Sequence, residues 1–216
     1  MNFVAWDIET DTSGGGGLDP TVAGVVSIAA AVYRSSPTGL TEHEVFYDAV
    51  AGPSPISEAA LLVAFDRWLA ARALRDEDMT HLVGWNSAVF DAPFVARRSE
   101  ILRTEIDLYL SFAPEIVPKY EPLPGFAGGY HHRWYGLRSR DQAYGRFNRG
   151  WCEAAGINWR LKDVAEHHGL DPVRVDRENI HLLSGSELAA YNLSDVRMTA
   201  ALTAAAMGFP FEMGQR

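Results

Sequence analysis

The spacing of hydrophobic and polar residues along this chain predicts a series of strands followed by alternating helices and strands. Apolar runs rich in β-branched and aromatic residues predict strands at residues 2–8 and 24–34. A further strand is predicted at 42–48, and the turn at 37–39 predicts that the last two form a hairpin. From Ser57, apolar residues recur at helical spacing. Further along, the pattern predicts strands at 81–85 and 106–110 and helices at 93–102, 161–168 and 186–207.

This order of elements predicts an α/β fold, in which an antiparallel meander and later parallel strands form one mixed sheet flanked by helices. Residues 111–150 are rich in Pro, Gly and aromatic residues and lack clear periodicity. They predict a long irregular insertion of the kind that usually carries function or partner contacts. The sequence contains no internal repeat and no clear domain boundary, so we expect residues 1–216 to form a single domain.

Composition places this chain among ordinary globular proteins, with 47% hydrophobic and 22% charged residues. A single cysteine, Cys152, excludes an intramolecular disulfide and a cysteine-based metal cage, and it fits a reducing cytoplasm. The sequence has no apolar run of membrane-spanning length and no signal peptide at its N-terminus. We therefore expect a cytoplasmic protein with no membrane partner.

The net charge of −9 argues against a general nucleic-acid binder, but the charge is unevenly distributed. Residues 131–162 contain seven cations and two acids, a net charge of +5, against −14 for the remainder. Aromatic residues interleave with these cations, a combination that can bind phosphates and stack the bases of a single strand. A solvated helical face with its aromatic residues in the core explains the pattern equally well. In the first interpretation, Arg138, Arg140 and Arg146 contact the substrate.

A pair of carboxylates carries the most chemical information in the sequence. The apolar run that begins at Phe3 ends in Asp7 and Glu9, which are one residue apart. On a strand, two such side chains point to the same face. Their like charges repel, so a cation is expected between them, and hard divalent ions such as Mg²⁺ or Mn²⁺ favour clustered carboxylate oxygens. The pair therefore predicts a metal site at the end of the first strand.

Two later segments offer further polar side chains. Asp91 follows a predicted strand and lies near the start of a predicted helix, where Asp is a preferred cap. Tyr191 and Asp195 are four residues apart and share one face of the last predicted helix. Taken singly, these residues have ordinary explanations: a helix cap for Asp91, core packing for Tyr191 and a solubilising surface charge for Asp195.

Taken together and in this order, the three segments resemble the motifs of the DnaQ-like, or DEDD, 3′–5′ exonucleases on the ribonuclease H-like fold. The matching residues are Asp7-Ile8-Glu9-Thr10, Asn86-x-x-x-Phe90-Asp91 and Tyr191-x-x-x-Asp195. With Tyr191 in its last motif, the chain resembles the DEDDy branch of this superfamily. The other branch has a histidine five residues before the final Asp, and here that position is Ala190. The residues of the first two motifs look closest to those of the proofreading domains of family B DNA polymerases and their stand-alone relatives. Residues 160–170 are also similar to a helix that these enzymes carry before the last motif.

The resemblance implies a role for each matching residue. Asp7, Glu9, Asp91 and Asp195 would bind two divalent cations, Mg²⁺ or Mn²⁺, and two such ions can stabilise both the attacking and the leaving oxygen of an in-line displacement. Tyr191 would orient the attacking water, since a free tyrosine with a pKa near 10 is a poor base at neutral pH. Thr10, Asn86 and Phe90, which belong to the same motifs, would support the site and contact the substrate.

The expected activity is therefore metal-dependent 3′–5′ exonuclease cleavage of single-stranded DNA. No polymerase motif is present, so we expect a free-standing enzyme or one that works beside a polymerase or another replication or repair protein. An exoribonuclease acting on RNA stays open, because no residue can be assigned to sensing the 2′-hydroxyl. A non-catalytic nucleic-acid-binding module is a further alternative, although the four carboxylates and the tyrosine argue against it. A two-carboxylate glycosidase fits poorly, since it needs groups on opposite sides of a sugar.

Overall fold

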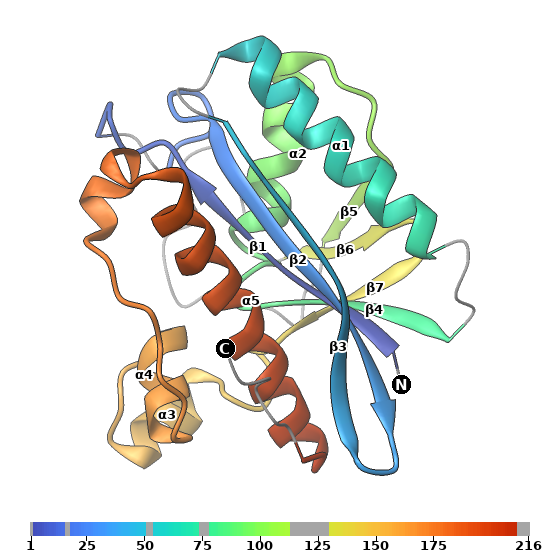
Figure 1. Cartoon of the computed structure of the whole chain (residues 1–216), viewed down its shortest axis with the longest axis vertical. Coiled ribbons are helices and arrows are strands. Elements are labelled where there is room, and N and C mark those ends of the chain that lie inside the picture. The colour runs from blue at the N-terminus through green and yellow to red at the C-terminus, as the bar shows by residue number, and fades with distance from the viewer. Residues whose placement is uncertain (1, 16–17, 51–53, 74–77, 113–129, 211–216) are drawn as a thin grey trace.

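In the part of the chain that the structure describes, one seven-stranded sheet organises the fold (Figure 1). The computed structural model describes residues 2–15, 18–50, 54–73, 78–112 and 130–210. The strands lie in the order β3-β2-β1-β4-β7-β6-β5. Their bounds are β1 (Asn2–Thr10), β2 (Val25–Ser36), β3 (Gly39–Ala49), β4 (Met79–Gly84), β5 (Leu108–Phe112), β6 (Tyr130–Trp134) and β7 (Leu137–Asp141).

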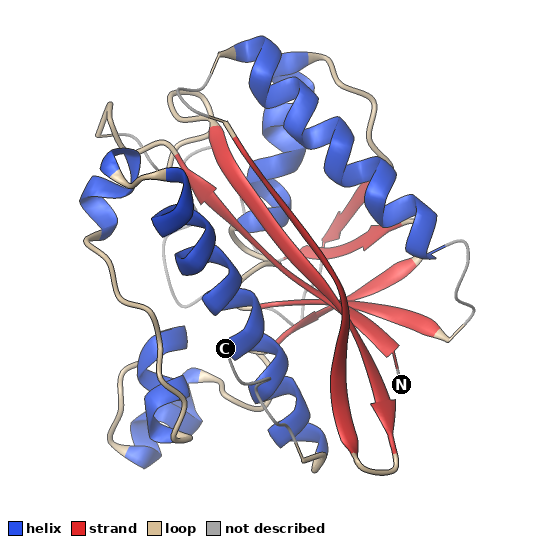
Figure 2. Ribbon diagram, viewed as in Figure 1, coloured by secondary structure: helices blue, strands red, loops and turns tan. Residues whose placement is uncertain are grey.

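Helices cover both faces of this sheet (Figure 2). One face packs against α1 (Pro55–Ala73) and α2 (Asp91–Leu102), and the other against α5 (Gly185–Met207). The short helices α3 (Arg149–Ala155) and α4 (Leu161–His167) lie beside α5, and a 3₁₀-helix, η1 (Arg177–Leu182), precedes it. No helix among the described residues is long and apolar enough to cross a membrane.

The sheet combines both kinds of strand pairing. β1 pairs with β2 and β2 with β3 in antiparallel fashion, whereas β1 with β4 and β4 with β7 are parallel. The predicted mixed α/β sheet flanked by helices is thus confirmed, and its arrangement is compatible with the ribonuclease H-like fold. Because β1 and β4 are parallel, their carboxyl ends meet at one edge of the sheet, where the predicted motifs of both strands lie.

The central strand β1 is buried on both faces, and its pleat decides which side chains meet which helix. Val4 and Trp6 belong to the core shared with α1 and α2. Phe3 and Ala5 belong instead to the core shared with α5. Since side chains alternate along a strand, the odd-numbered positions that continue this series turn toward α5.

The long helix α5 has clear start and stop signals. Ser184 forms a capping box with Glu187, and the helix ends at Gly208, whose φ of 74° is left-handed. Ala200 and Ala204 pack against Ala29 and Ala31 of β2. These small side chains let the helix lie close to the sheet, which brings its polar residues near the carboxyl end of β1.

The predicted irregular insertion at 111–150 differs from the structure. β6 and β7 lie within it and complete the sheet, and α3 begins at its end, while residues 113–129 lie outside the described residues. The sequence pattern misses the two strands because they are five residues long and mostly polar, Tyr-His-His-Arg-Trp and Leu-Arg-Ser-Arg-Asp, without the alternation that marks a strand. Pairing with β4 and β5, rather than local propensity, fixes them as strands.

Candidate active site

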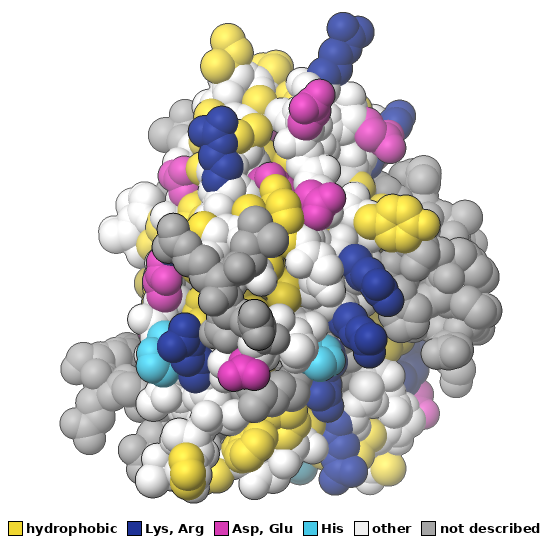
Figure 3. All heavy atoms as spheres, turned by 90° about the vertical axis from the view of Figure 1, so that its right-hand side faces the viewer, with side chains coloured by type: hydrophobic (Ala, Val, Ile, Leu, Met, Phe, Trp, Pro, Cys, Tyr) yellow, Lys and Arg dark blue, Asp and Glu magenta, His cyan; other side chains and the backbone are white. Residues whose placement is uncertain are grey.

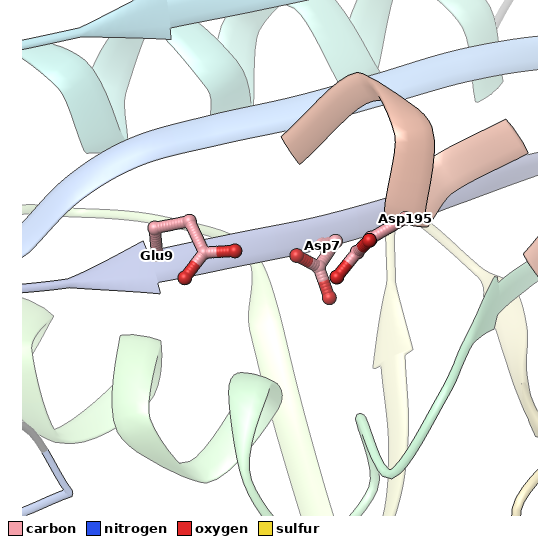
Figure 4. A group of neighbouring side chains, drawn as sticks. All are labelled: Asp7, Glu9 and Asp195. Carbon is pink, nitrogen blue, oxygen red and sulfur yellow. The ribbon is translucent and has the colours of Figure 1, made fainter. Parts of the chain in front are cut away.

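Three of the predicted carboxylates lie together at the carboxyl end of β1 (Figure 4). Asp7 and Glu9 come from β1 and Asp195 from α5, and each offers a ligand oxygen that lies within 4.8 Å of the others. Figure 4 shows the Asp7 and Asp195 side chains facing each other, with Glu9 further along the strand. Because side chains alternate along β1, Asp7 and Glu9 both face α5, the helix that carries Asp195.

The fourth predicted carboxylate, Asp91, borders this group through the backbone of β1. The N-cap of α2 is Phe90, and its side chain makes no capping bond. Asp91 itself accepts a hydrogen bond from the main-chain N–H of Ile8, with 3.3 Å between Ile8 N and Asp91 Oδ1. Asp91 is buried, and its negative charge is the largest charge effect on the pKa of Asp7. A cap role alone therefore does not describe Asp91.

Burial and mutual repulsion disfavour the ionised forms of these carboxyl groups. Burial is the largest cause in each case: it raises the pKa of Asp7 and Glu9 well above their usual range, that of Asp91 to about 7 and that of Asp195 to about 6. For Asp7, the neighbouring carboxylates raise the pKa further. A bound cation would remove this repulsion and favour the ionised forms.

The geometry and the donor set fit a divalent cation. Oxygen ligands lie about 2.0–2.6 Å from Mg²⁺ or Ca²⁺, so two ligands of one ion are separated by at most about 5 Å. The 4.8 Å limit on the Asp7, Glu9 and Asp195 oxygens satisfies this condition. An all-carboxylate set favours hard ions, the class that contains both Mg²⁺ and Mn²⁺.

Tyr191 lies beside the carboxylates on α5 and is fully buried. Its ring packs with Val26, Ile180 and Leu188. Its hydroxyl has no hydrogen-bond partner among the described residues. Burial, and then the charges of Glu9 and Asp195, raise the pKa of the phenol well above its usual value. The hydroxyl therefore keeps its proton and is suited to orienting a water molecule rather than to acting as a base.

Two cations next to the carboxylates were not predicted as site residues. Lys162, on α4, places its Nζ 3.0 Å from Asp195 Oδ1, 2.6 Å from the carbonyl oxygen of Val173 and 3.6 Å from the centroid of the Tyr191 ring. Arg177, the first residue of η1, exerts a favourable charge on all four carboxylates. Lys162 lies in the segment 160–170, which resembles a helix of the exonucleases, so the sequence offered a signal for this residue. No feature of the sequence pointed to Arg177.

A further unpredicted carboxylate, Asp141 at the end of β7, holds the loop between β4 and α2. It accepts hydrogen bonds from the main-chain N–H groups of Asn86 at 2.9 Å, Ala88 at 2.8 Å and Ala143 at 3.0 Å. Asn86 has a left-handed φ of 62°, and its side-chain oxygen accepts a bond from the Tyr144 hydroxyl at 3.3 Å. Asn86 thus lies in the loop that leads to Asp91, and its side chain contacts Tyr144.

The remaining predicted site residues lie around this centre. Thr10 is buried at the end of β1, where the pairing with β2 is shifted by an irregularity. Phe90 packs against Phe94, with 5.4 Å between ring centroids. Both are next in sequence to a carboxylate of the site.

The three predicted arginines lie apart from the carboxylates. Arg138 and Arg140 are on β7, and Arg140 contacts the Met207 sulfur at 3.6 Å, at the far end of α5. Arg146 is exposed in the turn before α3. None of the three forms an ion pair with the site carboxylates among the described residues. Figure 3, which views the right-hand side of Figure 1, shows several Lys and Arg side chains close together in the right-hand half of the view, with most of the acidic side chains above them.

Comparisons with known proteins show the fold. No protein-family profile matches this sequence, and no curated protein matches it. Among solved structures, the chain is similar to a family B DNA polymerase from the hyperthermophilic archaeon Pyrobaculum calidifontis, with a TM-score of 0.67 and 18% sequence identity. The match covers 96% of this chain and 24% of the polymerase chain. Nearly the whole chain therefore has the fold of a part of that polymerase.

Proposed function

We propose that this protein is a metal-dependent 3′–5′ exonuclease that hydrolyses phosphodiester bonds at the 3′ end of single-stranded DNA. The observation that carries the proposal is the group of Asp7, Glu9 and Asp195, whose ligand oxygens lie within 4.8 Å of one another at the end of a central strand. The ordered motifs that resemble DEDDy exonucleases support the reaction class and its direction. The similarity in fold to part of a DNA polymerase supports a nucleic-acid substrate.

The residues of the chain divide the work of such a reaction. Asp7, Glu9, Asp91 and Asp195 would hold two divalent cations, Mg²⁺ or Mn²⁺. When bound, these cations supply charge stabilisation for the attacking and leaving oxygens of an in-line displacement. The buried hydroxyl of Tyr191, which has no partner among the described residues, would position the attacking water.

The neighbouring residues would keep these groups in place. Lys162 offsets part of the negative charge at Asp195, to which it is ion-paired. Asp141 would hold the loop that carries Asn86 and leads to Asp91. We propose that Thr10 and Phe90, beside the carboxylates, contact the terminal nucleotide.

The proposed substrate path also includes Arg138, Arg140 and Arg146. It requires the strand to pass over β7 and the turn before α3. Alanine at all three positions, in an Asp7→Asn background that cannot cleave, should weaken oligonucleotide binding. It should also make the slope of log affinity against log salt shallower by roughly 0.7 for each phosphate that the protein no longer neutralises. An unchanged slope would place the strand elsewhere.

The proposed partners are single-stranded DNA and a polymerase or another replication or repair protein, and the proposed unit is one domain over residues 1–216.

The test of the proposed activity is degradation of 3′-labelled and 5′-labelled DNA and RNA oligonucleotides with Mg²⁺, Mn²⁺ or EDTA. We expect stepwise loss from the 3′ end of DNA, dependent on the metal and absent in Asp7→Asn. Asp171→Asn, an exposed acid outside the site, is the matched control.

Two outcomes would redirect the proposal. Preferential trimming of RNA would identify an exoribonuclease. Full activity after exhaustive chelation, or full activity of Asp7→Asn, would exclude the metal-dependent mechanism.

A further inference from the structure

The 3₁₀-helix η1 is fixed against the candidate site at two points. Ile180 is buried in the same apolar cluster as Tyr191 and Leu188. The next residue, His181, shares a hydrogen bond with Thr12 in the loop after β1, with 2.9 Å between His181 Nδ1 and Thr12 Oγ1. One end of η1 is therefore held between the tyrosine of α5 and the loop that follows Glu9.

Arg177 begins this helix, and its guanidinium is available to a ligand. The side chain is exposed, and it forms no hydrogen bond or ion pair with any residue in the part of the chain that the structure describes. Three residues earlier, Arg174 is also exposed but is paired with Asp163 at 3.0 Å and Glu166 at 2.9 Å. The two arginines are close in sequence yet differ in whether their donors are already used.

The position of Arg177 next to four carboxylates is informative because none of them is paired with it. Its positive charge lowers the pKa of Asp7, Glu9, Asp91 and Asp195 against the larger effect of burial. Arg177 begins the helix whose other end is held beside the site by Ile180 and His181, and it forms no ion pair with these carboxylates among the described residues. Lys162, the other nearby cation, is already engaged by Asp195 and the Val173 carbonyl.

Charge balance indicates what kind of ligand this arrangement suits. Four carboxylates and two cationic side chains leave two negative charges, and two divalent ions would turn these into two positive charges. Such a site attracts a phosphodiester anion once it holds its metals. A guanidinium presents a planar fork of donors that matches two phosphate oxygens, which an ammonium cannot do.

We propose that Arg177 is a substrate-binding residue that grips a backbone phosphate of the strand and holds it beside the carboxylate group. This inference rests on the proposed function, because it takes the substrate to be a nucleic-acid strand. It adds a contact on η1 that neither the motifs nor the basic stretch at 131–162 includes.

Binding of a fluorescent single-stranded DNA oligonucleotide, measured by anisotropy in EDTA and again with Ca²⁺, tests the proposal without relying on cleavage. Arg177→Ala should weaken affinity about tenfold or more, the size expected for a charge-assisted bidentate bond. Its salt slope should become shallower by roughly 0.7, the value for one phosphate neutralised on a single strand. Arg177→Lys should recover only part of the affinity, since it restores the charge without the fork.

Arg174→Ala is the matched control and should leave affinity and slope unchanged. In EDTA, Arg177→Ala should still fold, because the side chain is exposed, and should melt at or slightly below the temperature of the parent, because a charge favourable to the carboxylates is gone. With Ca²⁺ present, equal affinity and slope for Arg177→Ala and the parent would overturn the proposal, and so would a parent that binds no oligonucleotide under the same conditions. A parent that binds but never cleaves, with Arg177→Ala binding more weakly, would support the role of Arg177 while excluding the proposed nuclease activity.

Discussion

The main-chain N–H of Ile8 donates a hydrogen bond to Oδ1 of Asp91, with 3.3 Å between the two atoms. Ile8 lies between Asp7 and Glu9, so this bond fixes the first residue of α2 to the strand that carries two other carboxylates. Two chain segments distant in sequence are thereby held in register at one edge of the sheet. The geometry of the candidate site depends on this register. Substitutions at the residues of the site test its assignment directly.

Replacing Asp7 or Asp195 by Ala should reduce cleavage by about 10²-fold or more, because each carboxylate contributes to charge stabilisation in the transition state. The fold should survive. In EDTA, Asp7→Ala should melt at or above the temperature of the parent, since one of several repelling charges is gone, whereas Asp195→Ala should melt lower because it leaves Lys162 without its ion-pair partner. Initial rates and thermal melts of the same samples test both expectations, with Asp171→Ala as the control. Cleavage by Asp7→Ala within twofold of the parent would contradict the assignment.

Tyr191→Phe should slow cleavage about two- to tenfold, the worth of one neutral hydrogen bond, while leaving metal affinity nearly intact. The ring can still pack against Val26 and Ile180, so the variant should fold normally. Single-turnover rates and calorimetric titration with Mn²⁺ measure the two effects separately. A large loss of Mn²⁺ affinity would mean that the hydroxyl organises the metal ligands rather than the water.

Local sequence patterns predicted those parts of the fold that local patterns determine. The strands at 2–8, 24–34 and 42–48 and the helix at 186–207 match β1, β2, β3 and α5 closely. β1 and β2 have long apolar runs, the predicted hairpin turn joins β3 to β2, and α5 has both a capping box and a terminal glycine. The polar strands β6 and β7 and the short η1 lack such signals, since pairing and packing with distant residues define them.

The same distinction applies to the candidate site. Asp7, Glu9 and Asp195 were found because they belong to ordered motifs, and the structure brings them together. Asp141 and Arg177 belong to no motif. Tertiary contacts position Asp141 itself, and the contacts of Ile180 and His181 position η1, the helix that Arg177 begins. When a residue supports a loop, or faces a site from a neighbouring segment, the spacing of residue types in its own segment does not indicate that role.

The stability of the metal-free protein should fall as pH rises. Burial raises the pKa of Asp91 to about 7 and that of Asp195 to about 6, and it raises those of Asp7 and Glu9 as well. In the unfolded chain such groups titrate near pH 4, so at intermediate pH the folded state binds more protons than the unfolded state. The free energy of unfolding therefore decreases as pH rises through 6 and 7.

Urea unfolding in EDTA at a series of values between about pH 5 and 8 measures this dependence. Asp7→Asn combined with Asp195→Asn should flatten it, because two of the groups no longer titrate. Saturating Mn²⁺ should stabilise the parent most at the higher pH values, where the carboxylates are ionised. A parent whose stability rises steadily over this range in EDTA would contradict the expected direction.

Asp141→Asn should impair both the stability of the protein and the position of Asp91. The carboxylate of Asp141 accepts bonds from the N–H groups of Asn86, Ala88 and Ala143, so an amide nitrogen in place of one oxygen would face a donor. The expected loss is about 1–3 kcal/mol in the free energy of unfolding, the cost of a buried group left unsatisfied. Since small displacements of reacting groups are costly, cleavage should fall by up to about 10²-fold.

Asp107→Asn is the matched control for this variant, because Asp107 also accepts a main-chain N–H, from Tyr135 at 3.2 Å, but is exposed just before β5, outside the loop that leads to Asp91. It should leave cleavage unchanged. Rates measured well below the melting temperature of each variant separate positioning from unfolding. If Asp141→Asn loses stability yet cleaves at the parental rate, the loop from Asn86 to Asp91 keeps its position without the carboxylate, and Asp141 serves only the stability of the sheet edge.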